Sequence, residues 1–255
     1  MAVKAPMPGY ARLDVNGARG LAIEGCHEAV EAILSLETLY EYAARQPDAR
    51  RFVGRAPAYA ITLGETCGPA VIRHAMRGGV LGRTGSDLFL PPTRGLRELV
   101  NSLRLRLSGV PTPEVIAVIS YRAGPLLRRS DVATREIKES HDLAVVLREM
   151  TAGEDREACL RAAGKLLASM ARAGAHHPDL NARNILITWD APAGAKGHML
   201  DVDRIRFHTP GDPLVWSANI ARLARSLRKL RDRKELDVSE EEIDLIRATS
   251  QMPRQ

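Results

Sequence analysis

The chain has 255 residues, 45% of them hydrophobic and 27% charged, which is a globular composition and enough chain for one large domain or two lobes. Lysine and arginine number 37 against 31 acidic residues; the net charge of +6 favours an anionic partner, although an ordinary soluble protein with a basic pI has such a charge too. A run of about 18 apolar residues is absent, so no transmembrane helix is predicted.

The cysteines and the N-terminal residues indicate in which cellular compartment the protein is expected. Cys26, Cys67 and Cys159 are far apart and lack metal-ligand spacing, so we expect reduced thiols in a cytosolic protein. The N-terminus lacks the apolar core of a signal peptide. Any membrane contact is therefore expected to be peripheral and on the cytoplasmic side.

The first part of the chain is predicted to be rich in strands. Residues 1–25 have no clear period and are expected to form a loosely attached arm, whereas the apolar spacing of 28–42 predicts a helix. Phe52-Val53, residues 59–63 and residues 70–74 then predict three successive antiparallel strands, separated by glycine-containing turns.

A helix and further strands are predicted next. Residues 87–90 extend a hairpin, and Thr93 is the expected N-cap of a helix that ends at Gly109. The apolar face predicted for this helix has leucines at steps of three and four: Leu96, Leu99, Leu103 and Leu107. Strands are predicted at 115–121 and 131–137.

The second half of the sequence is mostly helical in prediction. Helices are expected at 142–150, 154–172 and 216–231, each with an apolar face at helical spacing. Two short apolar strands, 185–187 and 198–200, flank a turn that contains proline and glycine. A helix therefore precedes, and a strand follows, the polar segment 176–184.

That polar segment carries the residues that point to chemistry. It holds His177, Asp179 and Asn184, and the strand after the turn ends at Asp201. Phosphoryl transfer requires a carboxylate near the acceptor hydroxyl and oxygen ligands that hold Mg²⁺ against nucleotide phosphates. A lone His-x-Asp or Asp-x-Asp has little value as a signal, but this ordered set after a strand-rich half favours an ATP-dependent phosphotransferase.

The polar segment belongs to a larger ordered set of distinctive segments. They are Val71-Ile72-Arg73-His74, Arg77-Gly78-Gly79, Arg97-Glu98, residues 109–113, His177-Pro178-Asp179-Leu180-Asn181, Leu200-Asp201-Val202-Asp203-Arg204, Trp216, residues 219–223 and Arg225-Ser226-Leu227. With these segments, residues from about Gly54 to Lys229 resemble the lipopolysaccharide kinase family, and within it the 3-deoxy-D-manno-octulosonic acid (Kdo) kinases. The resemblance implies an α+β, two-lobed, protein-kinase-like fold, with an N-terminal arm and helix at 1–50, a sheet-rich lobe at 51–140 and a mostly helical lobe at 141–255.

The resemblance also implies roles for these residues. Asp179 would be the catalytic base, His177 would support its loop, and Asn184 and Asp201 would be the Mg²⁺ ligands. ATP would bind in the cleft between the two halves.

Four further residues are implied to contact the nucleotide. Arg73 would stand where protein kinases have a lysine on the third strand, and Glu98 where they have the glutamate of a helix. The planar guanidinium of Arg73 differs from an ammonium in geometry, and a surface arginine on an edge strand is the alternative. Gly54 and Arg55 lie where a phosphate-covering loop belongs, although the segment is poor in glycine, and a plain strand turn there stays open.

The acceptor is expected to be a sugar. The segment between Asp203 and Pro213 is short and lacks the Ala-Pro-Glu of protein kinases, which argues against a peptide acceptor. The resemblance implies Kdo-bearing lipid A or another lipopolysaccharide core acceptor, reached from the cytoplasm at the anionic surface of the inner membrane. The basic residues Arg222, Arg225 and Lys229 of the last predicted helix are candidates for that contact, although such a face is usually only solvated.

Other functions remain as alternatives. They are a kinase of another small molecule or of protein serine, and a pseudokinase that binds nucleotide without turnover. The intact Asp179, Asn184 and Asp201 argue against the pseudokinase. No nucleic-acid partner is expected, because basic residues are not interleaved with aromatic ones.

Overall fold

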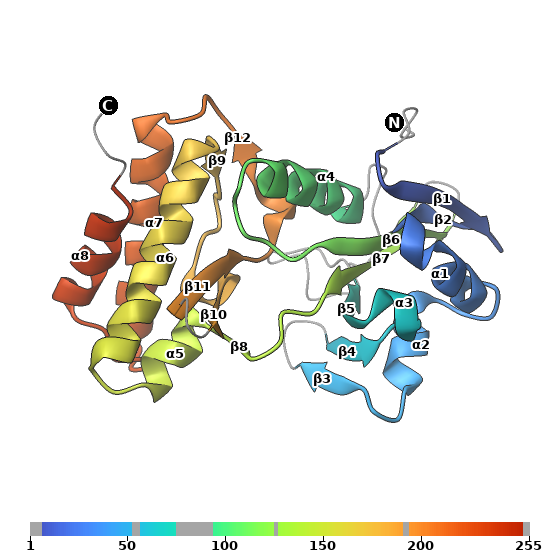
Figure 1. The fold of residues 1–255 in the computed structure, drawn as a ribbon, viewed down its shortest axis with the longest axis horizontal. Coiled ribbons are helices and arrows are strands. Elements are labelled where there is room, and N and C mark those ends of the chain that lie inside the picture. The colour runs from blue at the N-terminus through green and yellow to red at the C-terminus, as the bar shows by residue number, and fades with distance from the viewer. Residues whose placement is uncertain (1–6, 53–56, 75–93, 125–126, 191–193, 252–255) are drawn as a thin grey trace. The chain divides into compact units, whose positions relative to one another are not determined.

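The computed structural model of the chain describes residues 7–52, 57–74, 94–124, 127–190 and 194–251 (Figure 1). It has two compact units. Unit 1 comprises residues 1–100 and 114–136, and unit 2 comprises residues 101–113 and 137–255. Among the described residues, no helix combines the length and the apolar character that crossing a bilayer requires.

Unit 1 is built on one antiparallel sheet, whose order within the described residues is β1-β2-β6-β7-β5-β4-β3. The strands predicted at 52–53, 59–63, 70–74, 115–121 and 131–137 are confirmed, with shifts of their ends. The seven strands are β1 (Tyr10–Val15), β2 (Ala18–Ile23), β3 (Arg50–Phe52), β4 (Ala58–Thr62), β5 (Pro69–His74), β6 (Val115–Arg122) and β7 (Arg128–Arg135).

The expectation of a loose arm at 1–25 is wrong for β1 and β2. They form a hairpin whose turn is Asn16-Gly17, both with positive φ, of 50° and 80°. Asn-Gly is a strong sequence signal for a two-residue hairpin turn. Strand β2 pairs with β6, and the Tyr10 hydroxyl donates a hydrogen bond of 2.5 Å to the carbonyl oxygen of Val115. Residues near the N-terminus are therefore part of the sheet.

The single helix expected at 28–42 is two helices, α1 (His27–Leu34) and α2 (Leu39–Arg45). The second helix begins after Thr38, its N-cap, whose side chain accepts a hydrogen bond from the backbone N–H of Glu41 in a reciprocal capping box. Both helices contribute to the core of unit 1. The other helical segments that begin in this unit are η1 (Glu24–Cys26), α3 (Gly64–Cys67) and α4 (Arg94–Leu107).

Helix α4 confirms the predicted helix but not all of its apolar face. Leu99 is buried, whereas Leu107 is 88% exposed. Gly95 lies so close to the sheet that a Cβ atom there would be 2.8 Å from Val118 and 2.9 Å from Ser130. The residues of α4 that are buried are Gly95, Glu98, Leu99, Ser102 and Leu105. The predicted N-cap Thr93 and the hairpin at 87–90 lie outside the described residues.

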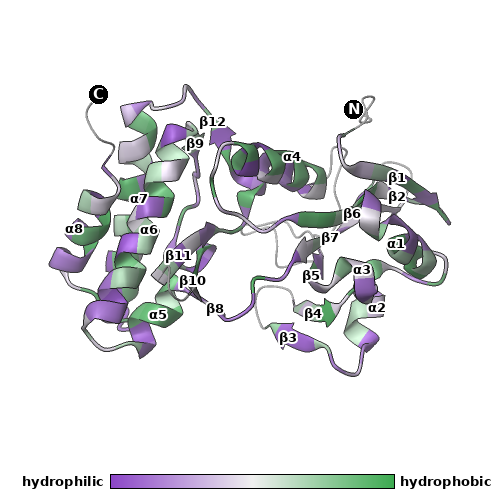
Figure 2. Ribbon diagram, in the orientation of Figure 1, coloured by the Kyte–Doolittle hydropathy of each residue, from purple (hydrophilic) through white to green (hydrophobic). Residues whose placement is uncertain are grey.

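Unit 2 is mostly helical, and the helices predicted in it are confirmed. Helix α6 packs against β11, α7 and α8 (Figure 1), and in Figure 2 the helices α6 and α7 carry hydrophobic residues interleaved with hydrophilic ones. The elements are β8 (Ser140–Asp142), α5 (Leu143–Glu149), α6 (Glu154–Arg172), β9 (Ala175–His176), η3 (Ala182–Asn184), β10 (Ile185–Asp190), β11 (Gly194–Met199), η4 (Val202–Arg204), β12 (Arg206–Phe207), α7 (Pro213–Asp232) and α8 (Glu240–Thr249).

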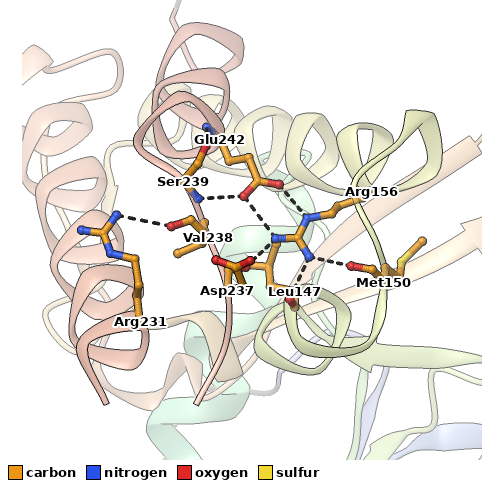
Figure 3. A network of polar contacts seen from close by, with 8 residues as sticks. All are labelled: Leu147, Met150, Arg156, Arg231, Asp237, Val238, Ser239 and Glu242. Atoms are coloured by element: carbon orange, nitrogen blue, oxygen red, sulfur yellow. Dashed lines mark hydrogen bonds and ion pairs between the residues drawn. The ribbon is translucent and has the colours of Figure 1, made fainter. Parts of the chain in front are cut away.

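Helix α8 was not predicted, although its sequence carries a start signal. Ser239 and Glu242 form a capping box, and Ile243 and Ile246 are buried in the core of unit 2. Glu242 also accepts two hydrogen bonds, of 2.6 and 3.1 Å, from the nearly buried guanidinium of Arg156 on α6 (Figure 3). This contact ties α8 to α6.

Candidate active site

The polar loop after β9 is held by α7. The backbone N–H of His177 donates to Asn219 Oδ1 at 3.0 Å, and Asn219 Nδ2 donates to the Ala175 carbonyl at 2.9 Å. Just before β9, Gly174 has a φ of +66°, and a Cβ atom there would be 2.3 Å from the carbonyl oxygen of His208. Only glycine fits this approach. The start of the loop is therefore fixed by the fold.

His177 lies inside this loop and is fully buried. Its Nδ1 accepts a hydrogen bond of 3.2 Å from the backbone N–H of Asp179. Burial lowers the pKa of His177, and the negative charge of Asp201 opposes that shift only in part. A neutral imidazole that accepts at Nδ1 carries its proton on Nε2. His177 thus holds the backbone of Asp179 through a hydrogen bond, while its part in the reaction stays a prediction.

The backbone of Asp179 is also bound from within the loop. Its carbonyl oxygen accepts from Asn181 Nδ2 at 3.0 Å and from Asn184 Nδ2 at 3.3 Å. The second bond uses the amide nitrogen of Asn184 and leaves Oδ1 of that side chain as an oxygen that can bind a metal. Two of the predicted site residues, Asp179 and Asn184, are thereby brought together.

The pairing of β10 with β11 brings Asp201 to the same part of unit 2 as Asn184. Ile185 pairs with Met199 in the antiparallel β10–β11 register, and the N–H of Leu200 donates to the Asn184 carbonyl at 2.8 Å. Asp201 follows directly, in the left-handed region at φ 55° and ψ 45°. A non-glycine residue in that region is uncommon, and such residues cluster at functional sites.

The donor set fits a hard divalent cation. Asn184 Oδ1 and the Asp201 carboxylate are oxygen ligands of the kind that Mg²⁺ prefers, and Mg²⁺ usually keeps several waters and takes substrate phosphates as further ligands. In the described part of the chain, no group of three or more His, Cys, Asp and Glu side chains is placed to hold a metal. With Asn184 and Asp201 as protein ligands, a magnesium ion would take phosphate and water oxygens for the rest of its ligand shell.

The carboxylate of Asp179 faces two arginines. Arg204, at the end of η4, donates to Oδ2, and Arg222 on α7 lies 3.6 Å from Oδ1. The Asp179 side chain is 36% exposed, so it stays accessible to a substrate. The sequence did not predict these partners of Asp179, because they come from two elements that only the folded chain brings to the loop.

Arg73 and Glu98 form a close ion pair within unit 1. Arg73 Nη2 on β5 lies 2.6 Å from each carboxylate oxygen of Glu98 on α4. Glu98 is only 5% exposed, so its charge requires a partner. The pair that the resemblance implied is present, while its contact with nucleotide stays a prediction. Gly54 and Arg55 lie outside the described residues.

Replacement of Arg73 tests that contact. Arg73→Ala is expected to weaken ATP binding, and Arg73→Lys to restore it only in part, because an ammonium cannot reproduce the planar guanidinium. Calorimetric titration with ATP measures both. Arg19→Ala is the control, since Arg19 forms an exposed ion pair with Asp14 in the same unit. Equal ATP affinity in wild type and Arg73→Ala would show that the ion pair between Arg73 and Glu98 has only a structural role.

Comparison with known proteins places the chain in a family. Residues 53–248 match the model of the lipopolysaccharide kinase (Kdo/WaaP) family. A 3-deoxy-D-manno-octulosonic acid kinase of Stenotrophomonas maltophilia strain R551-3 is 34% identical over 187 residues, 71% of each chain. The enzyme of that name from Vibrio parahaemolyticus is 33% identical over 165 residues, 63% of this chain and 65% of its own.

A solved structure supports the predicted fold. The structure described as WaaP in complex with acyl carrier protein aligns with a TM-score of 0.53 and 18% identity, covering 83% of this chain and 81% of that one. The predicted α+β, protein-kinase-like fold is therefore confirmed. The chain belongs to the lipopolysaccharide kinase family, and it is a kinase.

Proposed function

We propose that this protein transfers the γ-phosphoryl group of ATP, with Mg²⁺, to a hydroxyl of 3-deoxy-D-manno-octulosonic acid in the lipopolysaccharide core. The observation that carries the proposal is the loop geometry, in which Asp179 is fixed through His177 and Asn184. The acceptor is inferred from the names of two relatives, which are 3-deoxy-D-manno-octulosonic acid kinases.

The residues of the loop and its neighbours have separate roles in the proposed reaction. Asp179 Oδ1 accepts the proton of the acceptor hydroxyl as the oxygen attacks the γ-phosphorus, and the bond from that phosphorus to the β,γ-bridging oxygen breaks. Oδ2 is held by Arg204, so the carboxylate keeps one orientation. Asn184 and Asp201 would hold Mg²⁺, which when bound would supply positive charge that neutralises the phosphates.

The test of this function is transfer of labelled phosphate from ATP. Kdo-bearing lipid A, heptose-bearing core lacking Kdo and a generic protein substrate are offered in parallel. We expect phosphate in the Kdo-bearing acceptor and none in the protein. Labelling of protein serine without transfer to either glycan would overturn the acceptor assignment and favour the protein-kinase alternative.

The metal role predicts a linked loss of nucleotide binding. Asp201→Ala is expected to weaken binding of Mg²⁺–ATP while leaving binding of ATP in EDTA little changed, because the carboxylate acts on the nucleotide through the cation. Calorimetry with and without Mg²⁺ measures this difference. Asp244→Ala, which removes an exposed carboxylate of α8, serves as the control. Equal Mg²⁺–ATP affinity in wild type and Asp201→Ala would remove Asp201 from the metal site.

We also propose that the protein works at the cytoplasmic face of the inner membrane. Three basic residues of α7 have acidic partners within the chain and are weaker candidates for contact with anionic lipid. Arg228 and Arg231 pair with Glu240, and Arg222 faces Asp179. Arg225 and Lys229 are exposed on the same helix.

Vesicle binding tests the membrane proposal. Each basic side chain near an anionic surface contributes about 1 kcal/mol of binding free energy. In flotation with phosphatidylglycerol vesicles, wild type should be recovered with the vesicles at low salt, and this fraction should fall as salt rises. A smaller fraction of the Arg225→Ala/Lys229→Ala variant should float at low salt. A neutral phosphatidylcholine vesicle is the control. Flotation that is equal on both vesicle types would contradict an electrostatic contact.

A further inference from the structure

Two arginines share the carboxylate of Asp179, and their contacts with it are unequal. Arg204 Nη1 donates a hydrogen bond to Oδ2. Arg222 Nη2 is 3.6 Å from Oδ1, which is an ion pair but too long for a hydrogen bond. Arg204 thus restrains the carboxylate, whereas the N–H groups of Arg222 have no hydrogen-bond acceptor in the described part of the chain.

The two guanidinium groups converge on one carboxylate. Within the described residues, Arg204 and Arg222 both lie at ion-pair distance from Asp179. The side chains of Arg204 and Arg222 are 49% and 41% exposed, respectively. The guanidinium of Arg222 is therefore accessible to an anionic group of a bound molecule.

The position of Arg222 is built into the fold. It lies three residues after Asn219 on α7, and residues three apart are neighbours on one face of a helix. Asn219 is the buried side chain that binds the backbone of the loop at His177. The contact that fixes the loop on α7 therefore also places Arg222 beside Asp179.

We infer that Arg222 binds the carboxylate of the acceptor sugar and so selects an acidic sugar. This rests on the proposed function. A hydroxyl that reaches Oδ1 of Asp179 brings the rest of its sugar next to the free donors of Arg222, which can bind a carboxylate through two parallel N–H···O bonds. 3-Deoxy-D-manno-octulosonic acid has a carboxylate, and a heptose has none.

The test compares a soluble Kdo glycoside with its methyl ester, which has the same hydroxyls without the negative charge. Wild type should use the acid at least about tenfold better in kcat/KM, the usual scale for a hydrogen bond to a charged group. In Arg222→Ala this preference should vanish through a higher KM for the acid, with the KM for ATP unchanged. Arg222→Lys should restore it in part.

Arg172→Ala, which removes an exposed arginine of α6, should keep the wild-type preference. An acid-to-ester ratio that is the same in Arg222→Ala and wild type would overturn the inference. If wild type transfers phosphate to neither compound, the proposed function fails. Saturation-transfer NMR of the two compounds then still reports whether Arg222 binds the carboxylate.

Discussion

Asp179→Ala is expected to lower turnover by at least about a hundredfold, the usual scale for a positioned general base. ATP binding should remain nearly unchanged, because the side chain acts on the acceptor and the backbone of residue 179 keeps its bonds to His177 and Asn184. Single-turnover transfer to a Kdo-bearing acceptor measures the chemical step, and calorimetry measures ATP affinity.

Asp179→Asn separates two roles of this side chain. The amide can still accept from Arg204 but cannot take a proton, so it should keep the loop in place and lose turnover as the alanine variant does. Asp244→Ala is the matched control, because it removes an exposed carboxylate that pairs with Arg247 on α8. Retention of most of the wild-type turnover in Asp179→Asn would show that another group accepts the proton.

The local pattern of this sequence predicts the loop because its elements are contiguous. Segment 176–184 lies between a long amphipathic helix and an apolar strand, and Asp201 follows the next strand of the same hairpin. The spacing therefore determines which polar residues lie at the strand ends. The ion pair between Arg73 and Glu98 came from the resemblance, since no local rule joins a strand to a helix 25 positions later.

The parts that escaped prediction depend on distant partners. At the start of α2, the N–H of Leu39 donates to the Tyr121 hydroxyl at 3.0 Å, and the N–H of Tyr40 donates to Asp131 Oδ2 at 3.1 Å. These bonds join residues 82 and 91 positions apart, so spacing in the sequence cannot reveal them. The same holds for Arg204 and Arg222 beside Asp179. Helix α8 and the Asn16-Gly17 turn are different, because both carry local signals.

Arg156 is expected to contribute a large share of the stability of unit 2. Its side chain is 7% exposed, and it donates to Glu242 and to three backbone carbonyl oxygens, those of Leu147, Met150 and Asp237, at 2.7, 2.7 and 2.5 Å (Figure 3). Burial is the largest single effect and opposes the ionisation of Glu242, but the hydrogen bonds from Arg156 and from the backbone N–H of Ser239, together with the positive charge of Arg156, lower the pKa of Glu242. The guanidinium therefore satisfies acceptors from three separate segments, and the bond to Leu147 is fully buried.

Arg156→Ala should lower the free energy of unfolding by about 3–5 kcal/mol, the cost of breaking a buried ion pair from one side. Urea unfolding followed by circular dichroism measures the change, and Arg161→Ala, in an exposed pair with Glu157 on the same helix, should lose less than about 1 kcal/mol. The double variant Arg156→Met/Glu242→Met removes both charges. It should still be clearly less stable than wild type, because the three carbonyl oxygens lose their donor. Stability of Arg156→Ala equal to that of Arg161→Ala would contradict the proposed weight of this network, and full stability of the double variant would assign the loss to the unpaired charge of Glu242 alone.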